Sequence, residues 1–270
     1  MLVSLITMAA AVYVGLCLSL FFYQSRLVYF PSTHLYATPE SYGLAYEDVR
    51  LESGPQTSIH AWYIPNERAT LTVLFCHGNG GNMSDRPKTI ALLHKLGVNV
   101  LMFDYAGYGQ SSGSPSEAQT YRDALAAWNY LTHEKKIEAH RIVVFGRSLG
   151  SGIASWLATQ VDPAGLVMES AFTSVPDIGA RLYPFMPVRW IARIHYNNAS
   201  RVKALRIPLM VIHSVDDETV PFEHGQTLHQ LASEPKTFLE MHGSHNNGFL
   251  ETGQRYTEAL SSFFASLSNG

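Results

Sequence analysis

Short apolar runs, separated by polar and helix-forming segments, recur along the chain after Gly43. Eight of these runs are rich in β-branched and aromatic residues and are predicted strands: Tyr46–Leu51, Ser58–Ile64, Leu71–Cys76, Val98–Phe103, Arg141–Phe145, Gly165–Glu169, Pro208–His213 and Thr237–Met241. The first two are close enough to form an antiparallel hairpin. The later runs are continuously apolar, which is typical of a parallel sheet buried on both faces.

From the third strand onward, the segments between the predicted strands show the apolar periodicity of helices. The predicted helices are Met83–Leu96, Glu117–His133, Ser148–Gln160, Glu223–Ala232 and Glu251–Leu267. Strands that alternate with helices predict an α/β fold, with helices on both faces of a mostly parallel sheet of about eight strands. We assign this domain to residues 31–270 and expect its first polar stretch, Ser32–Gly43, to be a tether.

The N-terminal segment has a different pattern. Leu2–Ser25 contains no Asp, Glu, Lys or Arg and is long enough to cross the hydrocarbon core of a bilayer as a helix. A cleaved signal peptide is the alternative, but the segment has no positive n-region, and no small-x-small site in it precedes a polar mature start. We therefore expect residues 1–30 to form a single-pass membrane anchor whose partner is the lipid bilayer. Arg26 is the only positive charge near this helix, and one arginine does not fix the orientation.

One connection, Ala171–Ile207, is far longer than the others. It is too apolar for a disordered linker, and we expect residues 172–206 to form a small cap after the sixth strand. Its candidate substrate-binding side chains are Phe172, Tyr183, Phe185 and Trp190. Packing against the edge of the sheet explains the same composition, so a lid over an apolar pocket and a satellite core both stay open.

Composition narrows the possible function classes. Charged residues are 15% of the 270-residue chain, the formal net charge is −3 and the pI is near 6.4, so we expect no nucleic-acid partner. The two cysteines, Cys17 and Cys76, do not imply a disulfide framework. No cluster of residues has recognised metal-ligand spacing. The sequence predicts no particular oligomeric state.

The candidate chemistry centres on Gly146-Arg147-Ser148-Leu149-Gly150, between a predicted strand and a predicted helix. A serine at such a sharp turn lies above the sheet edge, at a helix N-terminus that favours developing negative charge. The pentapeptide alone is weak evidence, because a serine hydroxyl is a poor nucleophile without a base and an orienting carboxylate. Ser148 is therefore a candidate nucleophile only if such partners follow other strands.

Both partners are present in the expected chain order. Asp217 follows the seventh strand and His245 follows the eighth, as when a parallel sheet supplies all three groups from its C-terminal edge. An aspartate such as Asp216 or Asp217, taken alone, is typical of a turn, because its side chain bonds the nearby backbone. His242 is an alternative base, but we expect it to lie at the end of the strand. A metal pair of His242 and His245 lacks further ligands. The sequence therefore predicts a triad of Ser148, Asp217 and His245.

A glycine-rich loop, His77-Gly78-Asn79-Gly80-Gly81-Asn82, follows the third strand. We predict that the backbone N–H groups of Leu149 and Asn79 bind the oxyanion of a tetrahedral intermediate. A phosphate cradle is the alternative, but the loop lacks the Gly-Lys-Ser/Thr ending of a P-loop. His77 and the segment Asp104–Ser111 are expected to support this loop structurally.

Together these motifs resemble those of the α/β-hydrolase superfamily, and more narrowly those of the Bem46-like membrane-anchored serine hydrolases. The matching segments are Arg26–Pro31, His77–Asn82, Asp104–Gly113, Gly146–Gly150, Glu169–Ser174, Asp217 with Val220-Pro221, and His245-Asn246. At these positions the resemblance implies the same nucleophile, base, carboxylate and oxyanion donors as above. Ala106 and Ser151 depart from the arginine and the glycine expected there in many relatives.

The resemblance implies a hydrolase that cleaves an ester, thioester or amide bond through an acyl-enzyme on Ser148, without metal or organic cofactor. The anchor favours lipid or acylated substrates, and we expect carboxylic ester or thioester hydrolysis. A peptidase or amidase of the same fold is the alternative among enzymes. A non-catalytic, membrane-tethered binding scaffold is the alternative outside them.

Overall fold

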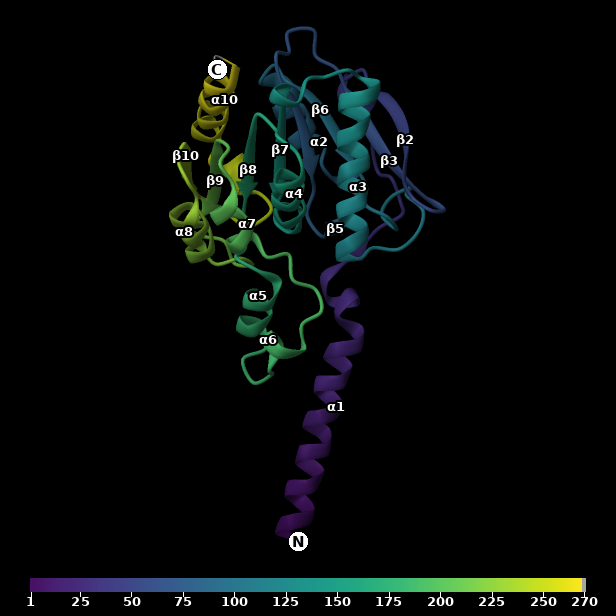
Figure 1. Ribbon diagram of the computed structural model, residues 1–270, viewed down its shortest axis with the longest axis vertical. Coiled ribbons are helices and arrows are strands. Elements are labelled where there is room, and N and C mark those ends of the chain that lie inside the picture. The colour runs from purple at the N-terminus through teal and green to yellow at the C-terminus, as the bar shows by residue number, and fades with distance from the viewer. Residues whose placement is uncertain (269–270) are drawn as a thin grey trace.

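In the computed structural model, which describes residues 1–268, eight strands form one sheet in the order β10-β9-β8-β7-β4-β6-β3-β2 (Figure 1). The strands are β2 (Glu47–Gly54), β3 (Thr57–Ile64), β4 (Thr72–Cys76), β6 (Asn99–Phe103), β7 (Ile142–Arg147), β8 (Gly165–Glu169), β9 (Leu209–Ser214) and β10 (Lys236–Met241). Neighbouring strands are parallel, except that β3 runs antiparallel to both β2 and β6. The predicted sheet, with its antiparallel first hairpin, is confirmed.

Helices cover both faces of this sheet (Figure 1). They and the short helical turns of the domain are η1 (Pro39–Tyr42), η2 (Met83–Asp85), α2 (Pro87–Lys95), α3 (Glu117–Asn129), η3 (Tyr130–Glu134), η4 (Ala139–Arg141), α4 (Leu149–Gln160), α7 (Asn198–Ala204), α8 (Phe222–Leu231), α9 (Gly248–Glu251) and α10 (Gln254–Ser268). Val144 of β7 packs in the core with α3 and α4, whereas Val143 and Phe145 pack in the core with α2 and α10. Successive side chains of a strand point to opposite faces, so β7 is apolar throughout and is buried on both sides.

The segment after the N-terminal helix is bound to the domain and is not a tether. It begins with β1 (Phe30–Pro31), which pairs in parallel with β5 (Gly80–Gly81) of the glycine-rich loop. The side chain of Asn82 donates to the backbone carbonyls of Ser32 at 3.0 Å and of His34 at 2.7 Å. The tether prediction is wrong because the partners of this polar stretch lie in a loop distant in sequence, which hydropathy does not reveal.

The N-terminal helix α1 (Leu2–Val28) extends away from the domain (Figure 1), and its length and composition would allow it to cross a membrane. The cap contributes α5 (Val175–Leu182) and α6 (Val188–Ile191), which lie beside the part of α1 nearest the domain (Figure 1). The partly buried positions at this end of α1 are Cys17, Leu20, Phe21, Gln24 and Val28. Their spacing of three or four residues places them on one face of the helix, toward the cap.

A buried ion pair joins three elements next to the candidate nucleophile. The Arg147 guanidinium of β7 lies 2.7 Å from Glu169 Oε1 of β8, and the Tyr256 hydroxyl of α10 donates to Glu169 Oε2 at 2.6 Å. Both charged side chains are almost completely buried. Because a buried charge is stable only when it is paired and hydrogen-bonded, each partner depends on the other.

We expect Glu169→Gln to lower the free energy of unfolding by about 3–5 kcal/mol, because the Arg147 charge would stay buried without a counter-ion. The matched control is Glu138→Gln, which alters the exposed pair of Glu138 and Arg141 and should cost less than about 1 kcal/mol. Urea denaturation followed by tryptophan fluorescence measures both losses. Equal losses in the two variants would contradict the structural role of the buried pair.

Candidate active site

The candidate nucleophile lies at a strained turn between β7 and α4. Ser148 has φ +52° and ψ −120°, a region that residues with a side chain rarely adopt, and α4 begins at the next residue, Leu149. A Cβ atom at Gly150 would collide with the carbonyl oxygen of Cys76, and one at Gly146 would collide with that of Gly150. The two glycines therefore allow α4 to start in contact with the sheet, and this contact holds the serine at the C-terminal edge.

Hydrogen bonds accommodate the two departures from the family pattern. The Ser151 hydroxyl donates to the Ser148 carbonyl at 2.6 Å and accepts from the Asn198 side-chain amide at 3.1 Å, which ties the start of α4 to α7. The N–H of Ala106 donates to the buried Asp123 carboxylate at 2.9 Å. The start of α4 and the loop after β6 are thus held without the expected glycine and arginine.

The three predicted catalytic side chains meet in one hydrogen-bonded chain. His245 Nε2 is 2.9 Å from Ser148 Oγ, and His245 Nδ1 is 2.7 and 2.9 Å from the two carboxylate oxygens of Asp217. His245 is buried, and its backbone N–H donates to Glu218 at 3.0 Å. A carboxylate at Nδ1 favours the tautomer that is protonated there, which leaves Nε2 free to accept a proton from the serine.

The surroundings of Asp217 keep it ionised. Burial raises the pKa of this carboxyl, but hydrogen bonds from His245 and from the N–H groups of Val220 and Thr219 hold the pKa below its usual value. The fully buried His213, whose pKa is lowered by burial, donates from Nε2 to the Val220 carbonyl at 2.8 Å. A neutral His213 therefore supports the loop that carries Asp217, a role that its position inside an apolar strand did not reveal.

The alternative acid and base considered from the sequence lie outside this chain of hydrogen bonds. Asp216 Oδ2 accepts from the N–H of Gly243 at 3.0 Å and lies 3.4 Å from His242 Nδ1. Both side chains are exposed, and the hydrogen bond from Gly243, together with His242, lowers the pKa of Asp216. This surface pair links the loops that follow β9 and β10.

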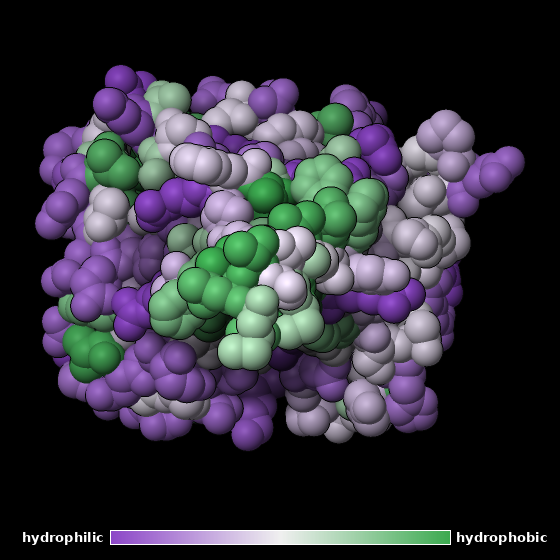
Figure 2. All heavy atoms as spheres, turned by 90° about the horizontal axis from the view of Figure 1, so that it is seen from below, coloured by the Kyte–Doolittle hydropathy of each residue, from purple (hydrophilic) through white to green (hydrophobic). Residues whose placement is uncertain are grey.

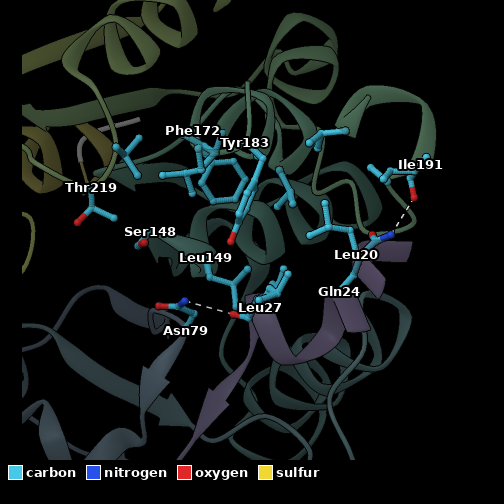
Figure 3. A pocket seen from close by; sticks show the side chains of 18 residues that line it. Leu20, Gln24, Leu27, Asn79, Ser148, Leu149, Phe172, Tyr183, Ile191 and Thr219 are labelled. Carbon is cyan, nitrogen blue, oxygen red and sulfur yellow. Dashed lines mark hydrogen bonds between the residues drawn. The ribbon is translucent and has the colours of Figure 1, made fainter. Parts of the chain in front are cut away.

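The two predicted oxyanion donors lie close to Ser148 (Figure 3). Leu149 is the first residue of α4, so its N–H has no partner within the helix. Asn79 lines both cavities that reach Ser148, and its carbonyl accepts from the Phe30 N–H at 3.1 Å and from the Tyr108 hydroxyl at 2.8 Å. The segment after β6 thus supports the glycine-rich loop.

An apolar cavity of about 240 Å³ extends from Ser148 between the cap and α1 (Figure 3). Two of the predicted substrate-binding residues, Phe172 and Tyr183, line it. The other two, Phe185 and Trp190, are 87% and 90% exposed on the outside of the cap. The prediction that they lie in the pocket is therefore corrected. It failed because the apolar composition of the cap does not indicate which side chains point inward.

The N-terminal helix is also a wall of this cavity, which the sequence analysis missed. The helix residues that line it are Leu20, Gln24, Leu27 and Val28. The Gln24 side chain donates to the Ile191 carbonyl at 2.8 Å and accepts from the Arg193 N–H at 2.7 Å, which fixes the helix to the cap. A side-chain amide within an apolar helix needs hydrogen-bond partners. Gln24 was therefore the sequence signal that this helix contacts another part of the protein.

A second, polar cavity of about 450 Å³ also reaches Ser148. Its lining includes Arg86, Tyr36, His245 and Asn246. Within residues 1–268, no group of three or more His, Cys, Asp or Glu side chains is arranged to hold a metal ion. The serine therefore lies where an apolar and a polar cavity meet.

Comparisons with known proteins agree with this geometry. The profile of the α/β hydrolase fold matches residues 72–186. The uncharacterized protein Rv2307c of Mycobacterium tuberculosis is 36% identical over 261 residues, which cover 96% of this chain and 93% of that protein. The α/β hydrolase domain-containing protein WAV2 of Arabidopsis thaliana is 33% identical over 263 residues, with coverage of 87% and 85%. The chain belongs to the α/β-hydrolase family.

Two further comparisons place this hydrolase among its relatives. The uncharacterized membrane protein YNL320W of Saccharomyces cerevisiae is 30% identical, with 87% of each chain covered. The solved structure of the Pyrococcus furiosus esterase Pf2001 has a TM-score of 0.76 and covers 89% of this chain and 98% of that one. Its sequence identity is 19%, so the likeness shows the fold alone. Family and fold together support hydrolase activity.

The ionised Asp217 should make the stability of the hydrolase depend on pH with a definite sign. Its folded pKa lies below the unfolded value of about 3.9, so its contribution is fully present above that pH and is lost as the pH falls through the folded pKa. The unfolding free energy of wild type minus that of Asp217→Asn should be larger at about pH 6 than at about pH 3. Denaturation in one detergent at both pH values measures it, and a difference that grows in acid would contradict this sign.

Proposed function

We propose that this protein is a serine hydrolase that cleaves carboxylic ester or thioester bonds of lipid or acylated substrates through an acyl-enzyme on Ser148. The observation that carries the proposal is the hydrogen-bonded chain from Ser148 Oγ through His245 to Asp217. Each group lies on a different loop at one edge of the sheet. A serine with only a turn function needs neither a buried histidine nor a buried carboxylate beside it.

In the proposed reaction, His245 Nε2 takes the hydroxyl proton of Ser148 as the serine oxygen attacks the substrate carbonyl carbon. The carbonyl oxygen becomes negative and is bound by the N–H groups of Leu149 and Asn79. The bond to the leaving oxygen or sulfur then breaks, and His245 gives that atom its proton. Water, deprotonated by His245, then attacks the acyl carbon. The bond from this carbon to Ser148 Oγ breaks, His245 returns the proton to that oxygen, and the carboxylic acid is released. Asp217 stabilises the imidazolium in both halves.

Two cavities of different chemistry support an acyl substrate with a polar leaving group. The apolar cavity between the cap and α1 suits an acyl chain, because its lining is mostly aliphatic and aromatic. The polar cavity, which includes Arg86, suits the alcohol or thiol part. The scissile carbonyl would then lie at Ser148, where the two cavities meet.

The N-terminal helix supports a membrane location for the hydrolase. Its length and composition suit a membrane span, and the yeast relative is named a membrane protein. We therefore propose a single-pass anchor, as in the Bem46-like serine hydrolases that the motifs resemble. Tethering at a bilayer raises the effective concentration of membrane-resident acyl substrates.

The first test is covalent labelling of the full chain with a fluorophosphonate probe. Wild type should be labelled and Ser148→Ala should not, because the probe reacts with an activated serine hydroxyl. Ser148→Ala should also lower kcat/KM for a medium-chain ester by about 10³-fold or more. A folded wild-type protein that stays unlabelled would overturn the mechanism and favour a binding scaffold.

The identity of the base is tested with His245→Ala, and His242→Ala is its matched control. His245→Ala should lose turnover as Ser148→Ala does, because the serine loses its proton acceptor. His242→Ala should keep it, because His242 faces Asp216 at the surface. Circular dichroism shows whether both variants are folded, and equal turnover in the two would place the base elsewhere.

A further inference from the structure

The end of the apolar cavity farthest from the serine is formed jointly by the cap and α1. Ser148 and Thr219 lie at one end of the cavity, whereas Leu20, Gln24 and Ile191 lie at the other (Figure 3). The hydrogen bond from Gln24 to the Ile191 carbonyl holds this far wall together. The cavity therefore leads from the candidate nucleophile to a helix whose composition suits hydrocarbon.

The outer end of the cap extends along α1 in the direction of the N-terminus. The Tyr13 hydroxyl donates to the Phe185 carbonyl at 2.9 Å, and Cys17 Sγ lies 4.0 Å from Met186 Sδ. Tyr13 precedes the aromatic group Phe21–Tyr23 by eight to ten residues, which correspond to about 12–15 Å of helix. This length is about half of the ~30 Å hydrocarbon core, or one leaflet.

The cap tip, residues 182–190, exposes large apolar side chains beside this part of α1. Leu182, Phe185 and Trp190 are 66%, 87% and 90% exposed. Apolar surface left in water costs roughly 25 cal/mol per Å², a cost that is absent in lipid. Seen from the N-terminal end of α1, hydrophobic side chains gather around the centre of the molecule and hydrophilic ones surround them (Figure 2). The helix and the cap tip thus present neighbouring apolar surfaces.

We propose that the cap tip is immersed in one leaflet of a bilayer beside α1, and that the apolar cavity opens into this leaflet as a site for the acyl chain of a membrane lipid. A chain that enters sideways from the leaflet exchanges one apolar environment for another. A chain that first passes through water would lose about 0.8 kcal/mol per CH₂ group. The role of this chain as substrate rests on the proposed serine hydrolase, whereas the position of the cap tip does not.

Two arginines of the cap fit this arrangement. The Arg193 guanidinium lies 5.1 Å from the centroid of the Phe21 ring, at the level of the aromatic group that suits the membrane interface. Arg189 is paired with Asp177 at 3.0 Å and remains 66% exposed, so its long side chain is able to reach lipid headgroups. Only apolar side chains of the cap tip then need to lie deeper.

Trp190 reports directly on the position of the cap tip. The other tryptophans, Trp62, Trp128 and Trp156, are buried or partly buried, so the fluorescence lost in Trp190→Phe is that of one exposed indole. The full chain is reconstituted in phosphatidylcholine vesicles with plain acyl chains or with acyl chains dibrominated near their middle. We expect the brominated lipid to quench the Trp190 signal and aqueous iodide to leave it unchanged.

Two other outcomes of this experiment would overturn the proposal. Quenching of Trp190 by iodide but not by brominated lipid would place the cap tip in water. Protection from both quenchers would mean that protein, such as a second copy of the chain, covers the tip. Neither outcome depends on enzymatic activity, so this test is separate from that of the proposed function.

The acyl site is tested by filling its far end. Leu20→Trp, in the cavity wall, should lower the ratio of kcat/KM for p-nitrophenyl palmitate to that for p-nitrophenyl butyrate by about tenfold or more, because the long chain loses its space. The matched control is Leu18→Trp, an exposed position on the same helix outside the lining, which should keep the wild-type ratio. If wild type and both variants are labelled by the fluorophosphonate and both variants keep the wild-type ratio, the acyl-site proposal is overturned. The serine hydrolase proposal would still hold in that case.

Discussion

The close approach of α4 to the central strands is the constraint on which the candidate site depends. A non-glycine residue with positive φ costs on the order of 1 kcal/mol or more, and it persists only where the surrounding packing determines it. Here Gly146 and Gly150 allow that packing, and the Ser148 N–H donates to the Glu169 carbonyl at 2.9 Å. The turn is thus tied to β4, β7 and β8 at once. The loops after β9 and β10 then need only follow the same sheet edge to bring the acid and the base to the serine.

The glycine-rich loop is held from the side of α1, which joins the N-terminal helix to the chemistry. The Phe30 N–H donates to the Asn79 carbonyl at 3.1 Å, and the Asn79 side chain donates to the Val28 carbonyl at 3.2 Å. The parallel pairing of β1 with β5 extends this connection by two residues on each strand. An apolar helix therefore ends directly on the loop to which we assign oxyanion binding. In this chain the helix and the site form one structural unit, and the helix is more than an attachment.

Features that depend on local pattern and chain order could be predicted from the sequence. Continuous apolar runs identified the strands, and the order of Ser148, Asp217 and His245 along a parallel sheet predicted that they would meet. The bound segment Ser32–Gly43 could not be predicted in this way, because a polar stretch has the same composition whether water or a distant loop satisfies it. The prediction that Trp190 lines the pocket was wrong for a related reason. Hydropathy measures how well a side chain suits an apolar environment. It does not say whether that environment is the protein core, a cavity or lipid.

The cap illustrates this last point, since neither of the two interpretations of its sequence describes it fully. A lid and a satellite core would both bury the aromatic side chains of the segment, yet only some of them turn inward. Phe172 and Tyr183 line the cavity, whereas Phe185 and Trp190 point outward and are almost fully exposed. A segment with two apolar faces is unfavourable at a boundary with water, because one face always remains exposed. It is favourable between two apolar environments, and an acyl cavity on one side with a lipid leaflet on the other provides both.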